Sequence, residues 1–138
     1  MKQLIALLAA SALACSGAPA PPSPPTFSSQ PSQTVISASG QLTLTIFEQA
    51  DRPISRGVNA LRLEVTSDAG ADLSALSLSA TTWMPVMGHG SATTPTVTPE
   101  GHGFSLSNVY LAMPGQWELR FDFAGSVTDH ALARFDVD

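Results

Sequence analysis

Methionine and histidine side chains gather in one stretch of this sequence, and they are the residues best suited to chemistry. The segment Trp83-Met84-Pro85-Val86-Met87-Gly88-His89-Gly90 carries both types. Thioether sulfur is a soft metal ligand and imidazole an intermediate one, so this combination suits Cu(I) better than other common metals. We therefore predict a Cu(I) site drawn from this segment and from two later residues. The candidate ligands are Met84, Met87, His89, His102 and Met113.

The neighbours of these residues place them at strand ends and in turns. Pro85 and the glycines around His89 interrupt a strand, Gly101 and Gly103 flank His102, and Met113-Pro114-Gly115 is a turn signal. A single ion would require Met84 or Met87, together with Met113, to converge with one of the two histidines.

Other readings of these residues stay open. Methionine often fills cores against aromatic rings, and Trp83 is adjacent, so the same segment is also consistent with loop packing and no metal. Zinc rarely accepts thioether ligands, and a blue-copper site needs a Cys thiolate, whereas the single Cys is Cys15 at the N-terminus. The spacing matches no established catalytic motif, so we do not expect an enzyme.

The composition limits the partners. Charged residues make up 12% of the 138 residues, against about 25% in a typical soluble domain. The formal net charge is −5, and the only Lys is Lys2. Nucleic acids and anionic membrane surfaces are bound through basic patches, so this balance argues against both as charge-driven partners.

The N-terminus has the pattern of a bacterial export signal. Residues 1–14 combine Lys2 with a short apolar run and end in Ala12-Leu13-Ala14, too short for a membrane span. Cys15 follows directly, as in a lipoprotein, which predicts lipidation of Cys15. The alternative is cleavage at the same A-x-A site by ordinary signal peptidase. Lipidation implies attachment to the periplasmic face of a membrane, and Ser16 after the Cys favours the outer membrane.

The remaining chain divides into a linker and one domain. Residues 15–39 are rich in Pro and Ser, which favours an extended polyproline II tether. Residues 40–138 show a period-two pattern broken by turn clusters, and apolar and polar residues alternate strictly over 42–46, 61–65, 76–80, 117–123 and 131–137. With shorter segments at 94–98 and 104–111, this pattern predicts an all-β, immunoglobulin-like β-sandwich of about seven strands.

Several segments together resemble a known family. They are Arg56-Gly57-Val58-Asn59, Leu61–Val65, Met84–Gly90, Gly101–Phe104 and Met113–Leu119. Over residues 40–138 the chain looks like a YtkA-like domain, a family related to the FixH-like proteins. The resemblance implies an immunoglobulin-like sandwich in an exported or membrane-anchored protein, and copper handling or delivery through the five residues above. The alternative from another class is a metal-free interaction module that binds a partner protein of the cell envelope.

Overall fold

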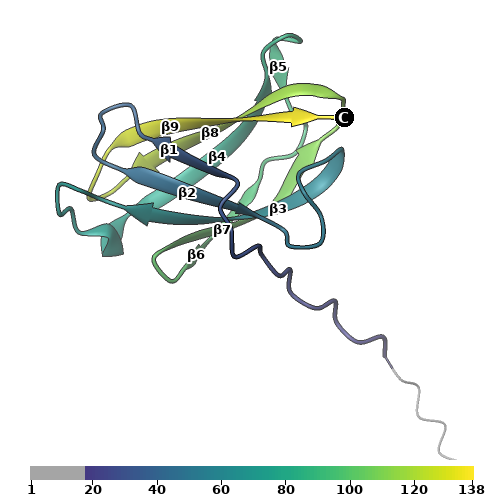
Figure 1. Cartoon of the computed structure of the whole chain (residues 1–138), viewed down its shortest axis with the longest axis horizontal. Coiled ribbons are helices and arrows are strands. Elements are labelled where there is room, and N and C mark those ends of the chain that lie inside the picture. The colour runs from purple at the N-terminus through teal and green to yellow at the C-terminus, as the bar shows by residue number, and fades with distance from the viewer. Residues whose placement is uncertain (1–17) are drawn as a thin grey trace, which may run out of the picture.

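The computed structural model describes residues 18–138, which form two antiparallel sheets packed face to face (Figure 1). Apart from one short 3-10 helix, these residues contain strands, turns and loops only. The elements are β1 Gln33–Ile36, β2 Thr43–Glu48, β3 Gly57–Thr66, η1 Leu73–Ala75, β4 Ser77–Met84, β5 His89–Gly90, β6 Thr96–Glu100, β7 Gly103–Leu111, β8 Gly115–Ala124 and β9 Asp129–Val137.

The two sheets have different sizes and orders. One contains five strands in the order β1-β2-β3-β7-β6, and the other contains four in the order β5-β4-β8-β9. Every strand pair in both sheets is antiparallel. The predicted all-β sandwich is therefore confirmed, with nine strands because two short ones, β1 and β5, join the seven expected.

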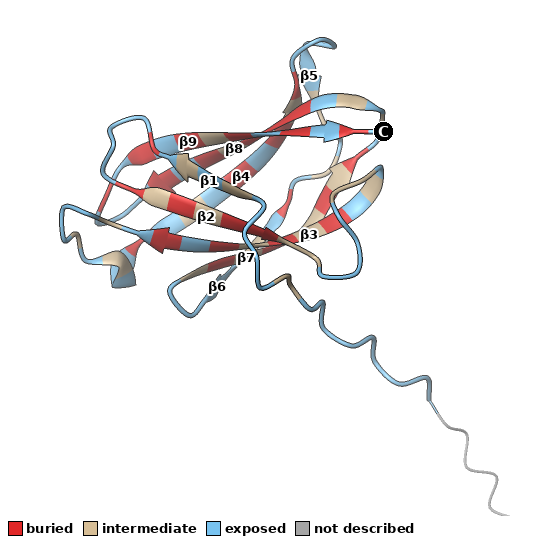
Figure 2. Ribbon diagram, viewed as in Figure 1, coloured by how far each residue is buried: buried red, intermediate tan, exposed pale blue. Residues whose placement is uncertain are grey.

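The core lies between the sheets and comes from the alternating positions. Figure 2 shows buried and exposed residues following one another along β3, β8 and β9. Trp117 and Phe121 of β8 are essentially inaccessible to solvent, as are Leu44 of β2 and Leu63 of β3. Each such large side chain contributes roughly 1.5–3 kcal/mol through its removal from water. The period-two pattern thus placed the core side chains correctly.

The folded unit begins earlier than residue 40. Strand β1 lies within the predicted linker and pairs with β2 from Gln33↔Ile46 to Ile36↔Thr43. Further upstream, Phe27 forms an isolated bridge with Gln49. The sequence predicts a linker here because the segment is rich in Pro and Ser. In addition, β1 is only four residues long and alternates weakly. The tether that the sequence suggested over residues 15–39 is therefore shorter, since its C-terminal part belongs to the sheet.

The described part of the chain does not include the segments that predict export. The expected signal peptide, residues 1–14, and the expected lipidation site, Cys15, lie outside residues 18–138. Within residues 18–138 no helix is long and apolar enough to cross a membrane.

Candidate metal site at the end of strand β4

The candidate ligands in the Met84–His89 segment sit on a tight hairpin that projects from the four-stranded sheet (Figure 1). Met84, the last residue of β4, is the direct cross-strand partner of His89, the first residue of β5. The intervening turn is closed by the N–H groups of Met87 and Gly88, which donate to the Met84 carbonyl at 3.1 and 3.0 Å. Gly88 adopts φ +68°, a left-handed conformation that glycine reaches without steric cost.

The Met84 side chain points into the sandwich. It is 3% exposed, and its Cε lies against Gly115, where the Cβ of any other residue would come within 2.7 Å of it. Gly115 opens β8 immediately after the β7–β8 turn that carries Met113. The half-buried Met113 packs against the core, and the indole Nε1 of Trp117 donates to its carbonyl at 2.9 Å. Met84 and the Met113 turn therefore meet at the same end of the sandwich.

The His89 ring is exposed and held in one orientation. Its Nδ1 is 3.0 Å from the carbonyl oxygen of Gly90. A carbonyl can only accept, so this contact is a hydrogen bond when Nδ1 carries the proton, and in the neutral ring of that form Nε2 has the free lone pair. This is the arrangement that prepares an imidazole to bind a metal through Nε2.

Met87 lies at the tip of the hairpin and faces solvent. It is 52% exposed and its neighbour Val86 is 79% exposed. A thioether in this position is accessible to an incoming or departing ion, whereas the Met84 sulfur is not.

His102 lies at the opposite end of the molecule. It occupies the turn between β6 and β7, where its carbonyl accepts from the Val65 N–H at 3.1 Å. Strand β7 runs from this turn to the end that carries Met113, and nine residues of strand span about 30 Å. One ion cannot reach both ends, so the structure separates His102 from the other four predicted ligands and leaves His89 as the histidine beside the methionines.

The donors at this end of the fold are chemically restricted. Among residues 18–138, no three His, Cys, Asp or Glu side chains converge in a way that could hold a metal ion. A metal bound by Met84, Met87, His89 and Met113 would therefore depend on thioether sulfur, which fits Cu(I) and not the metals that prefer oxygen ligands.

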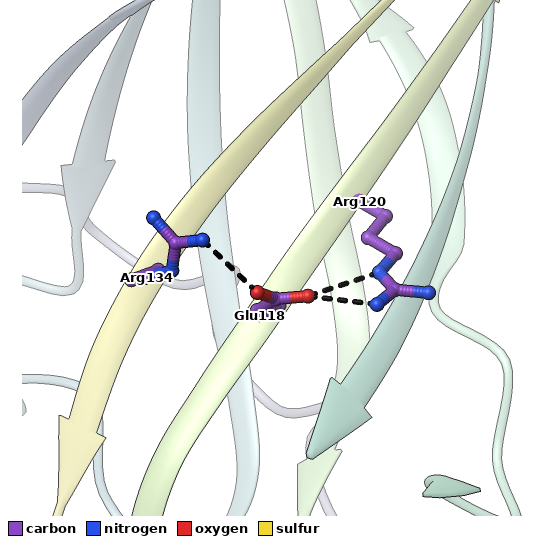
Figure 3. A network of polar contacts seen from close by, with 3 residues as sticks. All are labelled: Glu118, Arg120 and Arg134. Carbon is purple, nitrogen blue, oxygen red and sulfur yellow. Dashed lines mark hydrogen bonds and ion pairs between the residues drawn. The ribbon is translucent and has the colours of Figure 1, made fainter. Parts of the chain in front are cut away.

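A charged cluster on the outer face of the same sheet went unpredicted. Glu118 of β8 accepts from Arg120 at 2.8 Å and from Arg134 of β9 at 3.2 Å (Figure 3). The guanidinium of Arg120 also lies over the ring of Trp83, 4.7 Å from its centroid. The two ion pairs and the cation–π contact thus connect the end of β4 to β8 and β9, next to Met84. Alternation places all three charges on the outer face, but only the strand register brings them together.

The same cluster sets the ionisation of Glu118. Its side chain is 8% exposed, which by itself would favour the neutral form. The hydrogen bond from Arg120 has the larger effect, and with the contribution of Arg134 it holds the pKa of Glu118 below its usual value. Glu118 is therefore ionised at neutral pH and neutralises part of the arginine charge beside the candidate site.

Comparison with known proteins identifies the family. A family model described as YtkA-like matches residues 38–122, more than half of the chain. The chain belongs to the YtkA-like family. No curated protein and no solved structure matches it.

The YtkA-like match spans both ends of the sandwich. It begins just before β2 and ends inside β8, so it contains all five predicted metal ligands, including His102 in the β6–β7 turn. It leaves out β1 and β9, which complete one edge of each sheet. The resemblance inferred from the Met84–Gly90 and Met113–Leu119 segments is thus confirmed.

Proposed function

We propose that this YtkA-like domain binds Cu(I) at the end of β4 and acts in copper handling or delivery in the cell envelope. The observation that carries the proposal is the cross-strand pairing of Met84 with His89, next to the turn of Met113. Met84, Met113 and His89 would hold the ion, and the exposed Met87 would serve its entry and release. The soft donor set supports copper over zinc.

The exposure of the hairpin supports delivery over storage. Transfer of Cu(I) between proteins proceeds by ligand exchange, which needs a site that a partner's ligands can approach. His89 and Met87 are open to solvent, while Met84 is buried. An ion held between them would be accessible from one side only.

We further propose that Cys15 is lipidated and that the domain faces the periplasm, tethered to the outer membrane. The supporting observations are the apolar run before residue 15 and the single thiol that directly follows Ala12-Leu13-Ala14. Mass spectrometry of the full chain purified from membranes tests this: diacylation at Cys15 supports it, and a free Cys15 in a soluble fraction contradicts it.

One feature favours a second candidate, a metal-free interaction module. Four large hydrophobic residues are exposed within the described part of the chain, and two of them, Val86 and Met87, are adjacent at the hairpin tip. An apolar tip of this kind is suited to insertion into a partner protein.

Anaerobic titration with Cu(I) against a chromophoric chelator separates the two candidates. Residues 18–138 contain the nine described strands and the core between the two sheets, so this fragment is suitable. We expect one equivalent of Cu(I) to be withdrawn from the chelator, and a His89→Ala/Met87→Ala double variant to lose this competition. His130→Ala, which removes an exposed histidine of β9, is the matched control and should bind as the wild type does. A wild-type domain that does not compete overturns the copper proposal and leaves the interaction module.

A further inference from the structure

A cavity of about 600 Å³ opens at the end of the sandwich opposite the candidate metal site. It lies between the end of β3, the connection that contains η1, and the β6–β7 turn with His102. This volume is within the range of small-molecule binding pockets, about 300–1,000 Å³. The proposed copper function does not use this end of the molecule.

The inner wall of the cavity is apolar. Val65, Leu76 and Phe104 line it and are all buried members of the main core. Leu73 of η1 adds a partly buried side chain that packs against the same core. A ligand that enters the cavity would therefore exchange water for hydrocarbon contacts.

The mouth of the cavity carries a fixed negative charge. Asp72 caps η1, and its Oδ1 accepts from the N–H and the hydroxyl of Ser74 at 2.9 and 2.6 Å. The Ser74 side-chain hydrogen bond, reinforced by the backbone one, lowers the pKa of Asp72, so this carboxylate is ionised at neutral pH. Its Oδ2 makes no hydrogen bond within residues 18–138 and is available to a ligand.

The rest of the mouth carries no side chain with a permanent positive charge. The exposed His102 lines the cavity between two glycines, and none of the residues that line it is Lys or Arg. The whole chain carries a net charge of −5. Carboxylate or phosphate ligands would meet like charge here without a compensating lysine or arginine, whereas a cation would be attracted.

We propose that this cavity binds a small organic ammonium ion with an apolar body. The hydrocarbon would lie against Leu73, Leu76 and Phe104, and the ammonium would lie at the mouth beside the Asp72 carboxylate. Because an apolar wall lies beside a single carboxylate, the cavity should favour such an ammonium ion over fatty acids and neutral lipids.

Three probes of equal chain length test the charge preference: hexylammonium, hexanol and hexanoate. Each is titrated into isotopically labelled residues 18–138, and methyl shifts of Val65, Leu73 and Leu76 are followed by NMR. We expect hexylammonium to shift these methyls at the lowest concentration, hexanol at a higher one and hexanoate least. Equal or tighter binding of hexanoate, or shifts that avoid all three residues, overturns the proposal.

Two variants separate the charge from the apolar wall. Asp72→Asn keeps a helix-capping side chain and should weaken hexylammonium binding about two- to five-fold without affecting hexanol, as expected for an exposed ion pair. Asp68→Asn removes another acid from the same loop that does not line the cavity, and should change nothing. Leu73→Ser should weaken both hexylammonium and hexanol, whereas Leu132→Ser, at a partly buried leucine of β9, should weaken neither. Identical hexylammonium affinity in Asp72→Asn and wild type overturns the role of the carboxylate.

Discussion

Met84 and His89 lie opposite each other across the β4–β5 pair, yet Met84 is buried in the core and His89 is open to solvent. One member of this cross-strand pair therefore belongs to the core and the other to the protein surface. Side chains of directly paired residues point to the same face of a sheet. The two side chains thus lie on one face of the sheet, with Met84 packed in the core and His89 open to solvent.

The first prediction distinguishes the two histidines. His89→Ala should lower the Cu(I) affinity at least about tenfold, because it removes a ligand, whereas His102→Ala should leave the affinity unchanged. Competition with a chromophoric chelator measures both. A loss of affinity in His102→Ala equal to that in His89→Ala would contradict the assignment of the site to the β4–β5 end.

The second prediction concerns Gly115. Gly115→Ala places a methyl at φ +123° and within 2.7 Å of the Met84 Cε. The strained backbone should cost about 1–3 kcal/mol of unfolding free energy. The end of Met84 is flexible and should shift, which would lower the Cu(I) affinity.

Gly57→Ala is the matched control for this experiment. Gly57 has φ +100°, and no atom lies within 4 Å of the position that a Cβ would take, so alanine introduces strain but no contact. Both variants should be destabilised to a similar extent in urea denaturation, and only Gly115→Ala should bind Cu(I) more weakly. Wild-type affinity in both would exclude Met84 as a ligand.

The third prediction concerns the charged cluster. Glu118→Gln should lower the unfolding free energy by about 1–2 kcal/mol, because it leaves two arginines facing a neutral side chain. This figure is modest because Arg120 and Arg134 are 42% and 59% exposed. Urea denaturation measures the change. Glu64→Gln, which disrupts the exposed pair with Arg62, should change stability by less than about 0.5 kcal/mol. Equal effects of the two substitutions would contradict a special role of Glu118.

The fourth prediction concerns acid stability. Hydrogen bonds from the hydroxyls of Ser37 and Ser39 hold the pKa of Asp129 far below its usual value. A carboxylate with a lowered pKa stabilises the folded state above its unfolded-state pKa, about 3.9, and this stabilisation is lost as the pH falls below that value. Glu118 acts in the same direction. The melting temperature of the wild type should therefore fall steeply between about pH 4.5 and pH 2.

Asp129→Asn tests this explanation. It should melt at a lower temperature than the wild type at pH 7, and its melting temperature should fall less on acidification. Asp136→Asn, at an exposed position on the same strand β9, should keep the wild-type profile. An Asp129→Asn profile parallel to that of the wild type would show that other carboxylates cause the acid sensitivity.

Alternation was sufficient to predict the sandwich because burial on one face of a strand leaves a direct signature in the sequence. Trp117, Phe121 and Phe135, at alternating positions of the expected strands 117–123 and 131–137, are all buried. Strands β1 and β5 were missed because four and two residues are too few to establish a period. The site was harder to predict, since the distance between His102 and Met84 depends on how the strands are paired and at which end of the sandwich each strand terminates. The contacts of Glu118 depend on the pairing of β8 with β9, which residue types alone do not specify.

The bridge between Phe27 and Gln49 determines how far this domain can reach from an anchor. If Cys15 carries lipid, only about ten residues, 16–25, separate the membrane from the folded unit, and at about 3.1 Å per residue they extend roughly 30 Å. The whole of residues 16–39 would extend more than twice as far. Figure 1 shows the N-terminal segment leaving on the side of the molecule opposite the β4–β5 hairpin. A short linker attached at that side would keep the domain close to the lipid surface, with the hairpin directed away from it. The hairpin would then contact proteins of the periplasm and not the membrane itself.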